Sequence, residues 1–194
     1  MKSFLPGAGR RKAAAVSLAV AASLLVPAPA PAAADAPGET QAFCHIDVPQ
    51  VTVAPGFSSV PVRGTGASGP GANIRCLGTI QGHQVLADPG PLTVTFDYGT
   101  GPLSSITQGD TCLTGSGDGV VSATVTAVDG TVIDLTGPIH FSFVGPLATF
   151  YGHFGSVAYA GLAEPIPDLS TIQDCLVTPI TKFSIRGQIV LKNV

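Results

Sequence analysis

The chain contains no tryptophan, and charged residues make up only 11% of its 194 positions. Carbohydrate-binding sites usually present exposed aromatic side chains, so this lack weakens a carbohydrate-binding function. Three tyrosines, Tyr98, Tyr151 and Tyr159, could take the place of tryptophan, but tyrosine is more often buried. We therefore do not favour a lectin.

The usual catalytic motifs are also missing. The sequence has no Gly-x-Ser-x-Gly elbow, no His-Glu-x-x-His pair and no phosphate-binding glycine loop. It has no Cys-x-x-Cys spacing either, which argues against zinc. A Ser-His-Asp catalytic triad could assemble from residues distant in sequence, but the positions of the serines and histidines in the chain do not indicate whether it does. We predict no catalytic residue, no metal and no cofactor, and we lean towards a protein that is not an enzyme.

One glycine-rich segment has two readings. Gly115-Ser116-Gly117-Asp118-Gly119 is similar to one turn of the calcium-binding β-roll repeats, and Asp110 lies nearby. Those repeats work in tandem, whereas this chain has a single copy. We therefore predict a glycine-rich turn rather than a calcium site.

The first 34 residues have the features of a secretory signal peptide. Four basic residues precede an apolar stretch at 13–26, and three alanines at 32–34 form a small-residue cleavage site. The apolar stretch is shorter than the roughly 20 residues that span a membrane. Arg10-Arg11 would admit twin-arginine export, but Lys12-Ala13-Ala14 lacks the bulky apolar residue of that signal, so ordinary secretion is favoured. We expect cleavage before Asp35, and a secreted, extracellular protein without a membrane anchor.

Removing the signal makes the protein strongly acidic. The whole chain has nine basic and twelve acidic residues, and four of the basic ones lie in the signal. Five basic residues then face twelve acidic ones, a net charge of −7. This charge disfavours nucleic acid and anionic lipid as partners. Residues 35–194 suit a single domain, which we expect to be a monomer.

Composition and pattern predict an all-β domain. Valine and threonine are frequent, glycine and proline punctuate short segments, and no long stretch after the signal has a helical period. We predict an antiparallel β-sandwich or a flattened β-barrel of about eight strands, stapled by disulfides. The predicted strands include residues 42–53, 58–65, 72–80, 92–98 and 120–128.

Alternation predicts which side chains face inwards in the later strands. Ile139, Phe141 and Phe143 alternate with polar residues. In the last strand Phe183, Ile185, Ile189 and Leu191 share one face. The opposite face carries Lys182, Ser184, Arg186, Gln188 and Lys192. We interpret that charged face as a solvated one that guards against edge pairing, rather than as a site for an acidic partner.

Turn residues predict the connections. Asp129-Gly130 predicts a two-residue type I′ hairpin that pairs Val128 with Thr131, a register in which neither face is cleanly apolar. Gly152 and Gly155 predict a bulge, a bend or a close backbone approach in one strand region. Glu164-Pro165-Ile166-Pro167 should leave the sheet, and residues 168–173 could form a helical turn.

Four cysteines fit an oxidising compartment, where an even count usually means disulfides. Three pairings are possible. We favour Cys44 with Cys76, which lie in predicted strands, and Cys112 with Cys175, which lie in similar loop contexts. Loops of that length would contribute about 4 kcal/mol each in the chain-entropy account.

Two histidines suggest a candidate pocket that depends on one turn. A four-residue loop at 145–148 would place His140 opposite His153, where two imidazoles could bind a metal or transfer protons. A loop of Gly145-Pro146 alone would place His140 opposite Tyr151 instead. We favour ordinary half-buried sheet histidines. The candidate pocket comprises His140, His153, Tyr151, Phe141 and Phe150.

Four segments carry a resemblance. They are Val-Thr-Val-Ala-Pro-Gly at 51–56, Asp-Thr-Cys-Leu-Thr-Gly-Ser-Gly at 110–117, Gly-Pro-Ile-His-Phe-Ser-Phe at 137–143, and Asp-Cys-Leu-Val-Thr-Pro-Ile-Thr at 174–181. With the signal, this pattern resembles uncharacterised small secreted proteins of actinobacteria. The resemblance implies secretion and an all-β domain, and it implies no activity.

Three functions remain open. We expect a non-catalytic extracellular module that binds another protein or a surface component through its loops or an exposed strand edge. The alternative is a barrel that holds an apolar small molecule, or a barrel enzyme of isomerase or cyclase type. Its cavity would be lined by residues such as Phe141, Phe150, Tyr151 and Phe154, with His140 or His153 inside it. A third is a protease inhibitor that presents residues 161–169 as a rigid loop.

Overall fold

The computed structural model describes residues 38–102, 108–166, 175 and 177–194, and among these the chain forms nine strands and no helix. The strands are β1 (Gln41–Phe57), β2 (Gly64–Ser68), β3 (Asn73–Ile80), β4 (His83–Tyr98), β5 (Thr114–Thr126), β6 (Val132–Val144), β7 (Leu147–Phe154), β8 (Val157–Ile166) and β9 (Ile180–Asn193). The all-β prediction is confirmed. The predicted signal peptide and the helical turn at 168–173 lie outside the described residues.

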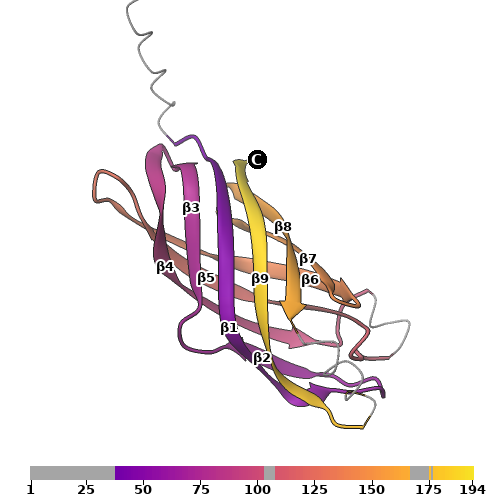
Figure 1. Ribbon diagram of the computed structural model, residues 1–194. Coiled ribbons are helices and arrows are strands. Elements are labelled where there is room, and N and C mark those ends of the chain that lie inside the picture. The colour runs from indigo at the N-terminus through magenta and orange to yellow at the C-terminus, as the bar shows by residue number, and fades with distance from the viewer. Residues whose placement is uncertain (1–37, 103–107, 167–174, 176) are drawn as a thin grey trace, which may run out of the picture. The chain divides into compact units, whose positions relative to one another are not determined.

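The sheet is antiparallel throughout and closes on itself, because β9 pairs with β1 (Figure 1). The short strands β2 and β3 share one place in the ring, since both lie between β1 and β4. The ring therefore has eight places, filled in chain order, and each described strand has a neighbour on both sides. Of the two predicted architectures, the structure is the barrel.

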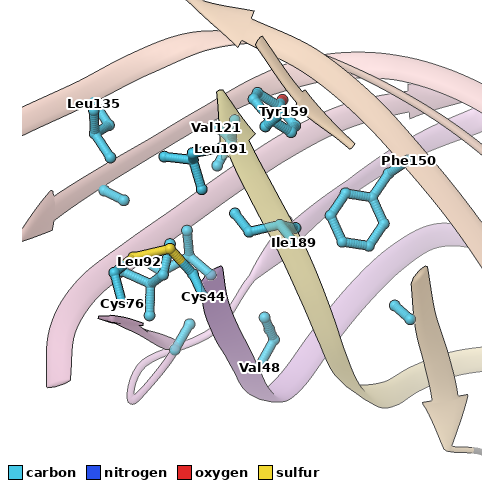
Figure 2. Close-up of a cluster of buried hydrophobic side chains, with 14 of the residues drawn as sticks. Cys44, Val48, Cys76, Leu92, Val121, Leu135, Phe150, Tyr159, Ile189 and Leu191 are labelled. Carbon is cyan, nitrogen blue, oxygen red and sulfur yellow. A yellow bond between two sulfur atoms is a disulfide. The ribbon is translucent and has the colours of Figure 1, made fainter. Parts of the chain in front are cut away.

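Side chains alternate between the interior and the outer face, as a closed sheet requires. The last strand follows its prediction, because Ile189 and Leu191 are buried inside while Lys182, Arg186 and Lys192 are exposed outside. Figure 2 shows Leu191 and Ile189 among the buried side chains of the core, together with Leu135 from β6 and Val121 from β5. The interior is thus the hydrophobic core of the domain.

The hairpin between β5 and β6 differs from its prediction by one residue. Val125 pairs with Ile133, and the Ala127 amide donates to the Thr131 carbonyl at 2.8 Å, so the turn is Val128-Asp129-Gly130, in which only Gly130 has a positive φ, 84°. A type I turn followed by a left-handed glycine has this form, whereas a type I′ turn needs two positive φ angles. The shift matters because successive side chains of a strand lie on opposite faces, so a change of one residue in the pairing moves each side chain to the other face relative to its partner strand. It places Val125 and Ile133 together inside the barrel, so one face is cleanly apolar.

Three predicted boundaries are wrong. The predicted strand at 58–65 is mostly a connection, and β2 begins only at Gly64. Gly155, with φ of 60°, lies in the turn that separates β7 from β8, so it marks a hairpin and not a bulge. Glu164 and Pro165 do not leave the sheet, because they pair with Arg186 and Ile185 at the end of β8.

Both predicted disulfides are present. Cys44 and Cys76 are direct partners on β1 and β3, with their Cα atoms 4.0 Å apart, and the bond lies inside the barrel (Figure 2). Cys112 and Cys175 join two segments that are 63 residues apart in sequence. Two disulfides indicate an oxidising environment.

Candidate ligand site inside the barrel

The two ends of the barrel interior differ in packing. One end contains the start of β1 and the end of β9, and its inward side chains, such as Ile80, Val85, Leu135 and Leu191, are almost completely buried. We call this the packed end. At the opposite end several inward apolar residues, such as Phe141, Phe143 and Phe183, keep part of their surface accessible, although they point into the ring. They do so because they face a hollow, and we call this the hollow end.

The hollow has a volume of about 150 Å³ and its wall is almost wholly apolar. Seven of the eight phenylalanines after residue 34 line it: Phe57, Phe96, Phe141, Phe143, Phe150, Phe154 and Phe183. Isoleucines from four strands complete much of the wall: Ile46, Ile74, Ile139 and Ile185. An apolar cavity of this volume in another protein admits benzene. The hollow can therefore hold a small apolar molecule or part of a larger one.

Glycines in the wall give the phenylalanine rings a place to lie. A Cβ atom on Gly66 would stand 2.2 Å from the ring of Phe96, and one on Gly117 would stand 2.7 Å from the ring of Phe141. Real atoms do not approach so closely, so the rings occupy the space that side chains would fill. The rings of Phe96 and Phe141 pack edge to face at 5.1 Å. They lie against the wall, and the centre stays open.

This arrangement corrects the prediction for Gly115–Gly119. The segment is not a turn but the first part of β5, in which the glycines face inwards. Glycine is usually a poor strand residue, and here rings of the neighbouring strands cover it. Asp118 points outwards and pairs with His140, with Oδ1 and Nδ1 2.5 Å apart. Among the described residues, no group of three or more His, Cys, Asp or Glu side chains could hold a metal ion.

The polar atoms of the wall are already paired. Ser68 Oγ accepts a hydrogen bond from the Val94 amide at 2.9 Å, and Tyr159 donates its hydroxyl to the Pro138 carbonyl at 2.7 Å. Burial raises the pKa of Tyr159 above its ordinary value, so this hydroxyl keeps its proton. No buried side-chain nitrogen or oxygen in the described residues lacks a partner. A ligand in the hollow therefore needs no charged or hydrogen-bonding group.

A buried carboxylate lies at the hollow end. Asp110 is completely buried, and the Ser116 amide donates to both of its oxygens at 3.0 and 3.1 Å. Tyr98 is buried near it and donates its hydroxyl to the Pro55 carbonyl. Burial, and then the negative charge of Asp110, raise the pKa of Tyr98. These groups tie the segments around the hollow together.

The structure divides the predicted pocket residues. Phe141 and Phe150 line the hollow, whereas His140, Tyr151 and His153 lie on the outer face. The connection between β6 and β7 is Gly145-Pro146 alone, so His140 pairs with Tyr151 and their rings stack at 5.1 Å. The pair of histidines that a longer loop would have formed does not exist. The sequence pattern identified three wall residues correctly, Phe141, Phe150 and Phe154, and could not choose between the two loop lengths.

A second hollow lies on the outside of the barrel. It is wider, about 520 Å³, but shallow and open to solvent, and it is bordered by polar residues such as Thr65, Thr95 and Asp97. Its lining mixes polar and apolar residues and offers less apolar surface than the interior hollow, so a ligand there would remove less apolar surface from water. The interior hollow is therefore the stronger candidate site.

The fold and the hollow together define a closed antiparallel β-barrel with an apolar interior lined by phenylalanine. No family model, curated protein or solved structure matches this chain. None of the described segments is a helix long and apolar enough to cross a membrane. Any function must therefore be argued from the barrel itself.

Proposed function

We propose that this protein is a secreted binding protein that holds a small apolar molecule in the hollow end of its barrel. The observation that supports this most is the ring-lined hollow of about 150 Å³ whose polar atoms are already paired. Eight-stranded barrels either fill their interior with side chains or hold one small ligand. Here the wall glycines hold the rings aside, which favours the second case.

Binding is favoured over catalysis because the described wall offers one titratable side chain, Tyr159, whose proton is held by burial and by its bond to Pro138. Isomerase or cyclase chemistry usually needs a group that can give or take a proton near neutral pH. The ligand would be neutral, with its apolar part inside the barrel.

A fluorescence titration tests this proposal. The protein has no tryptophan, so an aromatic probe such as 1-aminoanthracene can be excited without interference. Ala163→Phe and Ala148→Phe place a ring in the hollow and should abolish probe binding, because both alanines line it. Ala160→Phe, on the outer face of the same strand as Ala163, should bind like the wild type. Equal binding by all three variants would refute the proposal.

The protein-binding module predicted from the sequence is a second candidate. Closure of the ring removes the strand edges that it would use among the described strands. One outer patch on β6 to β8 favours it nonetheless, because its large apolar side chains are about half exposed or more: Val144, Leu147, Tyr151 and Leu162. Tyrosine is common in protein interfaces. Tyr151→Ser should abolish partner capture from culture medium without changing probe binding.

The protease-inhibitor alternative loses most of its proposed loop. Residues 161–166 belong to β8 and pair with β9, so they do not protrude as a free loop. Residues 167–169 lie outside the described residues.

A further inference from the structure

The outer surface of the barrel separates its charges by strand. Four of the five Lys and Arg residues after position 34 lie on the exposed faces of β3 and β9, which flank β1: Arg75, Lys182, Arg186 and Lys192. One carboxylate, Asp47, accompanies them and pairs with Arg186 at 3.6 Å. We call the outward side of β3, β1 and β9 the basic face; these three strands run side by side in Figure 1.

The other side of the barrel is acidic. The strands β4, β5 and β6 contain no Lys or Arg. Their exposed positions carry four carboxylates: Asp88, Asp97, Asp118 and Asp134. Although the net charge is −7, the protein therefore has a local positive region. The expectation that net charge disfavours anionic lipid as a partner does not apply to the basic face.

The centre of the basic face is apolar. Phe43 on β1 pairs with Leu77 on β3 and with Val190 on β9, so the three side chains form one row across adjacent strands. They are 40%, 57% and 54% exposed. The outward positions next to this row hold two cations, Arg75 and Lys192, and four polar residues: Gln41, His45, Thr79 and Gln188. Apolar side chains with cations beside them have the composition of a surface that binds the boundary of a lipid layer.

We propose that the basic face docks on an anionic lipid surface. A second copy of the chain fits poorly, because a two-fold contact through Phe43 would bring like charges together. A rigid protein partner also fits poorly, because the outside of a barrel is convex and neither hollow described above lies on this row. A lipid surface deforms around a convex row and supplies negative charge. This inference goes beyond the proposed ligand binding, and each can fail alone.

Flotation of the mature protein with vesicles tests the docking. Binding to phosphatidylglycerol vesicles should exceed binding to phosphatidylcholine vesicles and should weaken in 0.5 M salt. Phe43→Ser should reduce the affinity about tenfold, and Arg75→Gln or Lys192→Gln about fivefold each. Val120→Ser and Arg63→Gln are matched controls, because they change an exposed apolar residue and a cation outside the basic face. Both should bind like the wild type.

Three results would overturn the docking proposal. They are equal binding to both kinds of vesicle, an equal loss in the two controls, and capture of an acidic protein by the basic face without vesicle binding. Phe43→Ser should leave probe binding unchanged, and Ala163→Phe should leave vesicle binding unchanged, so failure of one proposal does not imply failure of the other.

Discussion

The packed end and the hollow end are built from the same eight places in the ring, yet one is solid and the other open. At the packed end branched aliphatic residues such as Ile80, Val85 and Leu135 fill the interior and are completely buried. At the hollow end three of the phenylalanine rings, those of Phe96, Phe141 and Phe143, lie over glycines in the wall. Residue size alone therefore does not decide whether a barrel is filled. What decides it is whether the neighbouring strand carries a glycine over which a ring can lie flat.

The largest predicted effect concerns the two disulfides, one at each end. Replacing either pair with alanine should cost about 4 kcal/mol of unfolding free energy, because each closes a loop of 32 or 63 residues. Cys112 lines the hollow, whereas Cys44 belongs to the packed end. Denaturant unfolding should show similar losses of stability in the two variants. Probe titration should show a changed affinity only in the variant that lacks the Cys112–Cys175 disulfide. A change in probe affinity in the double variant Cys44→Ala, Cys76→Ala would contradict the claim that only the hollow end binds the probe.

The next prediction compares two residues of β6. Leu135→Ala should cost about 4 kcal/mol, because it opens a cavity among fully packed side chains. Ile139→Ala should cost about 2 kcal/mol, because Ile139 already borders a hollow and loses fewer contacts. Urea denaturation measures both. Equal losses would mean that the hollow is as tightly packed as the opposite end.

A third prediction concerns the glycine wall. Gly66→Ala should push the ring of Phe96 into the hollow and weaken probe binding about tenfold, because the atoms that a new Cβ would meet are those of this ring. The double variant with Phe96→Leu should regain most of the affinity, since the smaller side chain leaves space. Affinity that stays low in the double variant would show that Gly66 acts on the backbone instead.

The smallest effect is expected at an exposed contact of the packed end. The Thr131 amide, and then the side chain of His83, lower the pKa of Asp129 to about 2. Because the pKa of Asp129 is lower in the folded state, its ionised carboxylate stabilises the fold at pH values above 3.8, the ordinary pKa. This stabilisation is lost as the pH falls towards about 2. Carboxyl NMR should give a midpoint near 2 for Asp129 and a higher one in His83→Gln. An unchanged midpoint in that variant would show that His83 does not lower the pKa of Asp129.

Much of the fold could be predicted from the sequence. The alternation of Phe183, Ile185, Ile189 and Leu191 with charged residues fixed the inward face of β9, because a strand has a period of two. The loop contexts and strand positions of the cysteines led to the correct pairings. These features are local, so a single strand or turn reveals them.

The hollow could not be predicted, because it depends on pairs of distant strands. Gly66 and Phe96 lie 30 positions apart and meet only through the pairing of β2 with β4. The glycines of β5 looked like a turn for the same reason, since the rings that cover them come from β4 and β6. The position of His140 depended on one choice of loop length. The missed hollow and the wrong prediction for the glycines of β5 thus reflect contacts whose partners are remote in sequence, whereas the error at His140 is local.

Methyl NMR of the protein during titration with naphthalene tests the central claim most directly. Ligand in the hollow should shift the methyl signals of Ile46, Ile139 and Ile185, which line it, and leave those of Ile80, Leu135 and Leu191 at the packed end unchanged. No shifts at saturation, or shifts confined to outer residues such as Leu77 and Val190, would contradict the claim that the hollow end binds an apolar ligand.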